Sequence, residues 1–224
     1  SVIQIFWVSI EASLSPWIYE NLDRNRKAEI RKLTTQVVLL FAVLCFGCTL
    51  FAPEIMTVLA PKSYSVGIYV IPSVAAGVFF TAVYSLYMRI ELFYKKTGFA
   101  TVASTLAALI NIITNYIFIS MYGFIAAGYT TLACYALLSF FHYVNVKHKG
   151  FDDSLDNRKI FIISLILFQT FYLLANYSNK YLNLFFLLTC YIIGNKKKQR
   201  GMKKAKFTFV NTYAFQLDIA HAVI

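Results

Sequence analysis

Five polar side chains stand within or beside long apolar runs of this sequence, where charged and amide groups are rare. Glu11, Arg89 and Glu91 carry charges, and Asn111 and Asn115 carry amides. A carboxylate at the centre of a bilayer costs about 2.5 to 3.5 kcal/mol on insertion scales, so an acid at such a depth is a functional hypothesis by default. We take these five residues as candidates for binding a substrate or for coupling its movement to an ion.

Glu11 lies deepest among the three charged candidates. If the first apolar run ends near Tyr19, Glu11 stands about 12 Å from that end at 1.5 Å per residue. Gln4, Glu11 and Ser15 share one helical face, which we expect to point into a bundle or a wet cavity. The alternative is a buried structural residue that is protonated or hydrogen-bonded. Arg89 and Glu91 end another apolar run, where an interfacial anchor or ion pair is the alternative because such side chains can snorkel to water.

The two asparagines continue a stripe of small and polar residues. Thr101, Ser104 and Ala108 precede Asn111 and Asn115 at spacings of three and four, so we expect the stripe to face the bundle and not lipid. Such stripes in membranes are typical of close helix packing. For the asparagines, contact with a substrate is the equal alternative, since a tight apolar interface tolerates an unpaired amide poorly.

The elements that must position these residues follow from composition. Of 224 residues, 59% are hydrophobic and 14% are charged, which indicates a polytopic membrane protein and excludes a soluble globular domain. The apolar runs lack the strict alternation of a membrane barrel, so we predict an all-α transmembrane helical bundle. The bundle would occupy residues 1–194, with a basic cytoplasmic tail at 195–224. Its predicted spans are 1–19, 33–60, 64–88, 99–120, 124–146, 160–176 and 181–194.

Two details of these runs are further expectations. Pro72 lies inside the third run, where we expect a kink because proline removes a helical hydrogen bond. The chain has no initiator methionine and starts in an apolar run, so we expect it to begin part-way through a longer protein.

Positive charge is distributed unevenly between alternate loops. Of the 21 lysines and arginines, 19 fall in loops assigned to one side and two, Lys62 and Lys180, to the other. The positive-inside rule places the first group, and with it the C-terminus, in the cytoplasm. The net charge of +11 is therefore interpreted as a topology signal, and we expect no nucleic-acid partner. The predicted location is the bacterial inner (cytoplasmic) membrane, with membrane lipids as partners.

No enzyme signature is present. The sequence lacks HExxH, GxSxG, P-loop and GxGxxG motifs, and its three histidines have no ligand spacing. Cys45 and Cys48 form a C-x-x-C pair without a second pair, so we interpret them as packing residues. His142 and His148 flank a membrane exit and are interpreted as interfacial. We predict no catalytic residue, no metal site and no cofactor.

Four segments carry a resemblance to a known family. They are FAPEIMTVLAPKSYSVGIYVIP, YKKTG, ALINIITNYIFI and YGFIAAGYTTL, which begin at residues 51, 94, 108 and 122. In order and spacing, across residues 1–146, they resemble the C-terminal half of Wzx-like oligosaccharide and polysaccharide flippases, within the multidrug/oligosaccharidyl-lipid/polysaccharide exporter superfamily.

The resemblance implies one lobe of a 12- to 14-span flippase that moves a lipid-linked oligosaccharide by alternating access. The missing N-terminal half would then supply the other wall of the cavity. In that family, cationic residues meet the pyrophosphate linker and, in some members, an acid couples a cation or proton. The nearest counterparts here are Arg89 and Glu11.

The leading hypothesis is flipping of a lipid-linked oligosaccharide for O-antigen, capsule or exopolysaccharide synthesis. A drug or metabolite exporter of the same superfamily is the alternative. A membrane glycosyl polymerase or acyltransferase comes third, because the longest external connection is short and such polymerases need a sizeable external loop.

Overall fold

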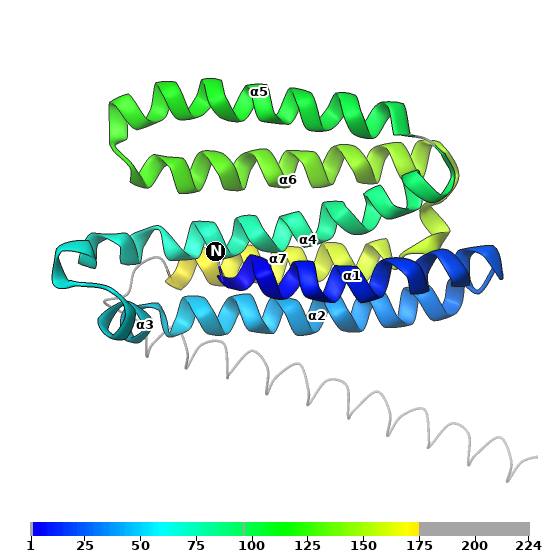
Figure 1. Ribbon diagram of the computed structural model, residues 1–224, viewed down its shortest axis with the longest axis horizontal. Helices are drawn as coiled ribbons and strands as arrows, with labels where there is room; N and C mark the ends of the chain where they lie inside the picture. Colours follow the sequence, from blue (N-terminus) through cyan, green and yellow to red (C-terminus); the bar gives the residue numbers. More distant parts are fainter. Residues whose placement is uncertain (1, 96, 175–224) are drawn as a thin grey trace, which may run out of the picture. The chain divides into compact units, whose positions relative to one another are not determined.

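The computed structural model describes residues 2–95 and 97–174, and these residues form helices joined by short connections (Figure 1). No strand occurs within these two ranges. The all-α membrane bundle expected from the composition is confirmed. The bounds of the helices are α1 Val2–Asp23, α2 Lys27–Leu50, α3 Ala52–Leu59, η1 Lys62–Tyr69, α4 Ile71–Phe93, α5 Thr97–Tyr122, α6 Ile125–His148, η2 Asp152–Ser154 and α7 Asn157–Leu174, where η marks a 3-10 helix.

Four of the described helices are long and apolar enough to cross a membrane. They cover Lys27–Leu50, Gly67–Phe93, Gly98–Tyr122 and Ile125–His148. α1 and α7 correspond to the first and sixth predicted runs but do not meet the same criteria of length and composition. The predicted run 181–194 and the predicted tail 195–224 lie outside the described residues.

Prolines divide the chain differently from the sequence prediction. The predicted run 33–60 is two helices, because α2 ends at Leu50 and α3 begins at Ala52. Pro53, the second residue of α3, has no backbone N–H to continue the α2 hydrogen-bond ladder. The kink expected at Pro72 is wrong as well, since Pro72 is the second residue of α4, where proline is tolerated. Pro16 lies inside α1, which continues to Asp23.

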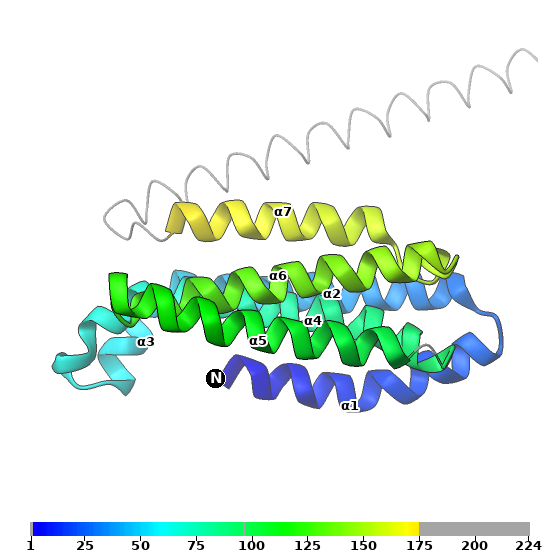
Figure 2. The ribbon, with the colours of Figure 1, turned by 90° about the horizontal axis from the view of Figure 1, so that it is seen from above.

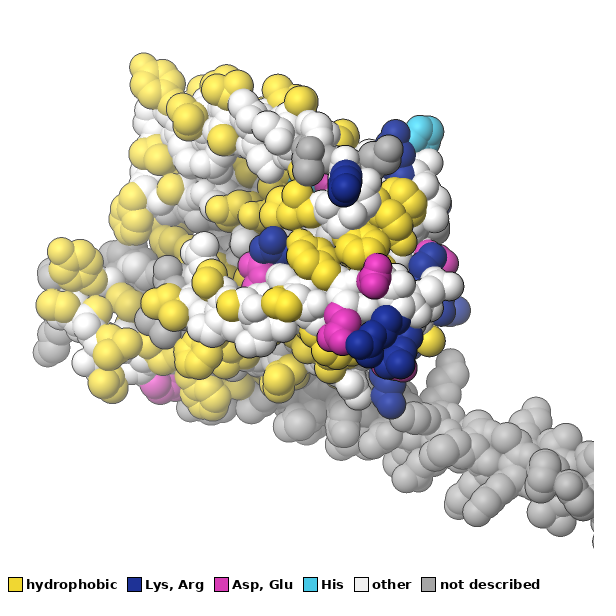
Figure 3. Space-filling model, turned by 45° about the vertical axis from the view of Figure 1, so that its right-hand side comes forward, with side chains coloured by type: hydrophobic (Ala, Val, Ile, Leu, Met, Phe, Trp, Pro, Cys, Tyr) yellow, Lys and Arg dark blue, Asp and Glu magenta, His cyan; other side chains and the backbone are white. Residues whose placement is uncertain are grey.

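The connections of the bundle alternate between two ends (Figures 1 and 2). The α1–α2, α4–α5 and α6–α7 connections share one end, where Lys27 pairs with Asp153 at 2.9 Å and the Tyr94 and Phe151 rings stack at 3.8 Å. We call this the basic end, defined by residues 24–32, 94–95 and 147–159. Figure 3 shows charged side chains gathered at one end of a largely hydrophobic face. The three described loops that charge counting placed on one side therefore lie together.

α4 is the central helix of the described bundle and contacts α1, α2, α6 and α7. Its core side chains include Phe79, Leu86 and Ile90, all at most 2% exposed, which pack with Trp7 of α1 and Phe41 of α2. α5 has a different environment, because it packs chiefly on α6 and exposes large apolar side chains along much of its length. Any charge carried on α4 is consequently held among several helices at once.

Candidate functional site

Arg89 and Glu11 form an ion pair between α4 and α1. Arg89 donates from Nη2 to Glu11 Oε1 at 2.6 Å and from Nε to the same oxygen at 3.0 Å. The two side chains are partly exposed, at 26% for Arg89 and 18% for Glu11. Both residues are candidates from the sequence, one as a cation and one as an acid, and the structure brings them together.

Neighbouring contacts hold α1 and α4 in the register that makes this pair. The indole N–H of Trp7 donates to the Ser85 hydroxyl at 3.1 Å, one helical turn before Arg89 on α4. Tyr19 interacts electrostatically with Arg89, and its ring stacks on Phe93 at 6.1 Å. Because Trp7 is only 1% exposed, its indole must find a partner inside the protein, and this requirement aligns the two helices.

Glu91 faces the opposite side of α4 and lies in a buried cluster with α6. His142 Nδ1 is 2.8 Å from Glu91 Oε2, and Asn145 donates from Nδ2 to Glu91 Oε1 at 2.8 Å. Glu91 is 1% exposed and His142 is fully buried. Both side chains point between helices and not toward water, so Glu91 is not the snorkelling anchor considered as one alternative for it, and the exposed interfacial position expected for His142 is wrong.

The second nitrogen of His142 has no hydrogen-bond partner in the described part of the chain. The imidazole ring stacks on Tyr84 at 5.8 Å and meets the edge of Phe99 at 6.0 Å. Sequence reasoning missed His142 and Asn145 as members of this cluster. Their spacing of three residues on one face of α6 was the available signal, but only the packing on α4 reveals the acid that they contact.

Asn111 and Asn115 join α5 to α6 through a small polar network. Asn115 donates to Asn111 Oδ1 at 2.9 Å, and Asn111 donates to the Thr131 hydroxyl at 3.4 Å. The Thr130 hydroxyl donates to Asn115 Oδ1. Both amides are thus used in interhelical contacts, which is the packing alternative considered for them.

The longer stripe expected on α5 does not form one inward face. Thr101, Ser104 and Ala108 are exposed, whereas Ala100 and Ala103 are buried against the bundle. Steps of three and four residues connect the asparagines both to the exposed face with Thr101 and to the buried face with Ala103. Asn111 and Asn115 therefore belong to the face that continues from the two buried alanines.

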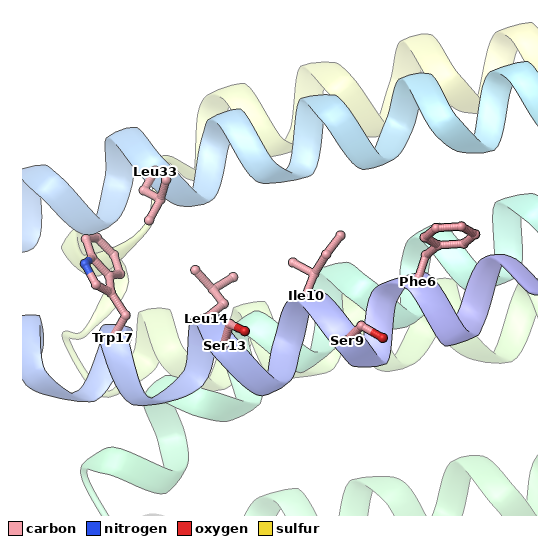
Figure 4. Close-up of a pocket in the computed structure, with 7 residues that line it drawn as sticks. All are labelled: Phe6, Ser9, Ile10, Ser13, Leu14, Trp17 and Leu33. Carbon is pink, nitrogen blue, oxygen red and sulfur yellow. The ribbon is translucent and has the colours of Figure 1, made fainter.

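Two apolar grooves lie away from the charged pairs. One, about 600 Å³ in volume, runs along α1 beside α2, and none of the five candidate residues lines it. Figure 4 shows its side chains, with the hydroxyls of Ser9 and Ser13 and the indole nitrogen of Trp17 as the polar groups on an otherwise apolar wall. The other, about 520 Å³, lies between α5 and α6 and includes Tyr122, Tyr129 and Thr130. Grooves of this composition suit acyl chains or neighbouring helices.

The described residues contain no cluster of three or more His, Cys, Asp or Glu side chains that could hold a metal ion. Cys45, Cys48 and Cys134 are free thiols in the described structure. What the arrangement offers chemically is a partly open guanidinium–carboxylate pair on one side of α4 and a buried carboxylate–imidazole–amide cluster on the other. The first can exchange partners with an anion, and the second links two helices.

No family model matches the sequence, and no solved structure matches it. A probable low-salt glycan biosynthesis flippase, Agl15 of Haloferax volcanii, is similar to the chain, with 24% identity over 134 residues. The matched region is 60% of this chain and 28% of the relative, so the chain spans less than a third of that protein in the match. The similarity is consistent with a flippase-like membrane protein, and the relative's name describes a transporter rather than an enzyme.

Proposed function

We propose that this chain forms part of a flippase that moves a lipid-linked glycan across the cytoplasmic membrane during assembly of a surface polysaccharide. The distant similarity to a glycan biosynthesis flippase and the helical membrane bundle support the proposal. The observation that carries it is the Glu11–Arg89 pair, because a partly exposed cation among membrane helices can receive an anionic linker. The described residues contain no cluster of three or more His, Cys, Asp or Glu side chains that would compete with this site as a metal centre.

Arg89 is suited to a phosphate group in its chemistry. A guanidinium has five N–H donors in a planar fork that matches phosphate oxygens. Arg89 donates both of its hydrogen bonds to the same oxygen of Glu11, so the carboxylate binds one edge of the guanidinium. In the proposed cycle a phosphate oxygen of the substrate replaces Glu11 on Arg89, and the pair re-forms after release. Glu11 thereby holds Arg89 when the substrate is absent.

The rest of the transport cavity would come from other parts of the polypeptide. We propose that an N-terminal half supplies the second wall and that membrane lipids surround both. We place the basic end in the cytoplasm by the positive-inside rule. The bacterial inner membrane stays the proposed location, although the relative comes from Haloferax volcanii, an archaeon.

The test uses the full-length protein reconstituted in liposomes with a fluorescent lipid-linked oligosaccharide. A membrane-impermeant quencher reports how much label reaches the outer leaflet. We expect Arg89→Gln to abolish most flipping and Glu11→Gln to reduce it, while Arg24→Gln, at an exposed pair with Glu20, leaves the rate unchanged.

Two results would contradict the proposal. Wild-type flipping by a correctly folded Arg89→Gln variant would remove the pair from the mechanism. Failure of the wild-type protein to move the glycan, with efflux of amphiphilic dyes in its place, would favour the exporter alternative.

A further inference from the structure

A polar groove of about 630 Å³ lies at the basic end, between the start of α2 and the start of α7. It is separate from the Glu11–Arg89 pair, and none of the five candidate residues lines it. α2 contributes Arg31, Lys32, Thr35 and Gln36, among others. The η2–α7 segment contributes Asp153, Asp156, Asn157 and Lys159, with Leu155 at the base.

The acidic side chains of the groove are already bound to basic ones. Asp153 accepts from Lys27 Nζ at 2.9 Å, and Asp156 pairs with Lys159 Nζ at 2.6 Å. Asp156 also accepts from the backbone N–H of Lys159 at 3.2 Å, and these contacts hold its pKa below the usual value. Both carboxylates thus act as internal partners of basic side chains and not as groups that await a cation.

Arg31 and Lys32 keep the positive charge of the groove accessible. Both side chains are exposed, and neither forms a salt bridge to the described residues. α2 and α7 also both begin at this end, so the positive ends of two helix dipoles meet beside the groove. An anion in the groove would be stabilised by the two cationic side chains and by the two helix dipoles.

Below the charged residues the same helix faces become apolar. On α2, Leu39 and Val43 follow Lys32 by seven and eleven residues and are 51% and 59% exposed. On α7, Ile162 and Ile166 follow Lys159 by three and seven residues and are 44% and 59% exposed. Because seven residues make nearly two helical turns, these apolar side chains continue the faces that carry the cations.

We propose that this groove binds an anionic phospholipid, with the phosphate beside Arg31 and Lys32 and the acyl chains along the apolar faces of α2 and α7. A cationic rim above exposed apolar helix surface matches the two parts of a lipid in the order in which a leaflet presents them. A soluble phosphate would use the rim alone and leave the apolar faces without a role. The inference holds whether or not the protein transports a glycan.

The test compares lipid retention by the full-length protein in native mass spectrometry. The protein is purified from nanodiscs that contain phosphatidylglycerol or phosphatidylcholine. We expect retention of phosphatidylglycerol by the wild type and a roughly 30-fold weaker affinity in the Arg31→Gln/Lys32→Gln variant. The matched control is Arg26→Gln/Lys149→Gln, which removes two exposed charges at the same end but outside the groove and should retain the lipid.

Other outcomes contradict the inference. Equal losses in the two double variants would show diffuse surface charge without a site, and equal retention of both lipids would exclude headgroup recognition. Competition by inorganic phosphate as effective as that by phosphatidylglycerol would identify a soluble anion site instead. If the Arg31→Gln/Lys32→Gln variant misfolds, Gln36→Glu is the substitute, because it keeps both cations and adds a repelling carboxylate at an exposed position.

Discussion

Replacing Glu91 by alanine removes the acceptor at the centre of the buried cluster between α4 and α6. The change leaves His142 Nδ1 and Asn145 Nδ2 without the oxygens that they contact at 2.8 Å. Neither group can turn to water easily, because His142 is fully buried and Asn145 is 9% exposed. The expected result is a large loss of stability and not a local adjustment.

The loss of stability shows whether the cluster behaves as two ordinary interhelical hydrogen bonds or as a buried group of mutually dependent polar side chains. Hydrogen bonds between membrane helices average about 0.6 kcal/mol, so two ordinary ones would sum to little more than 1 kcal/mol. Removing one partner of a buried charged pair costs about 3 to 5 kcal/mol, and each buried unsatisfied group about 1 to 3 kcal/mol. Because Glu91 is buried, we expect the larger cost, and Glu91→Ala should lower the free energy of unfolding by about 3 kcal/mol.

The assay is unfolding of the purified full-length protein by SDS titration in mixed micelles. Glu91→Gln should cost about 1 kcal/mol, since the amide oxygen still accepts from Asn145. Glu20→Ala is the control, because its pair with Arg24 is more than half exposed on both sides and should change stability by less than about 0.5 kcal/mol. A cost for Glu91→Ala no larger than that of Glu20→Ala would refute a dry, tightly packed cluster.

Three further predictions follow from other contacts. Gly128→Ala should destabilise the protein in the same titration, because the new Cβ would clash with the Ser73 hydroxyl, whereas Gly47→Ala, with no atom within 4 Å, should be neutral or stabilising. Asn115→Leu should cost about 0.6 kcal/mol and leave flipping unchanged if the amide serves packing; a selective loss of flipping would instead assign it to the substrate. In thiol labelling of intact cells, a cysteine at Tyr122 should react from outside and one at Lys149 only after permeabilisation, and the reverse pattern would invert the proposed orientation.

The described fold was predictable where it depends on local properties of the chain. Apolar length identified membrane helices, and the charge of alternate loops predicted that three described connections lie at one end. The helix boundaries near prolines were not predictable in the same way. A proline within an apolar run could stand inside a helix or in its first turn, and the sequence alone does not distinguish the two. Pro53 and Pro72 both prove to stand in first turns, where the missing N–H costs no hydrogen bond.

The candidate site was predictable in its members but not in its contacts. Periodicity selects Glu11 as an inward-facing acid, and the end of an apolar run marks Arg89 as a cation near a helix end. Nothing local, however, pairs residues that are 78 positions apart. Periodicity also left the buried face of α5 ambiguous, because Thr101 and Ala103 can each be joined to Asn111 by steps of three or four residues. Small differences in helix rotation decide such cases, and only packing sets the rotation.

The sequence by itself thus determined the class of protein, the polar groups within its apolar runs and the sharing of one end by three described loops, because hydropathy and charge act over single segments. The tertiary structure decided which of those groups meet. It set Arg89 against Glu11 on one side of α4 and Glu91 against His142 and Asn145 on the other. Two positions two residues apart on a helix face different neighbours, and the identity of a neighbour is a property of packed helices.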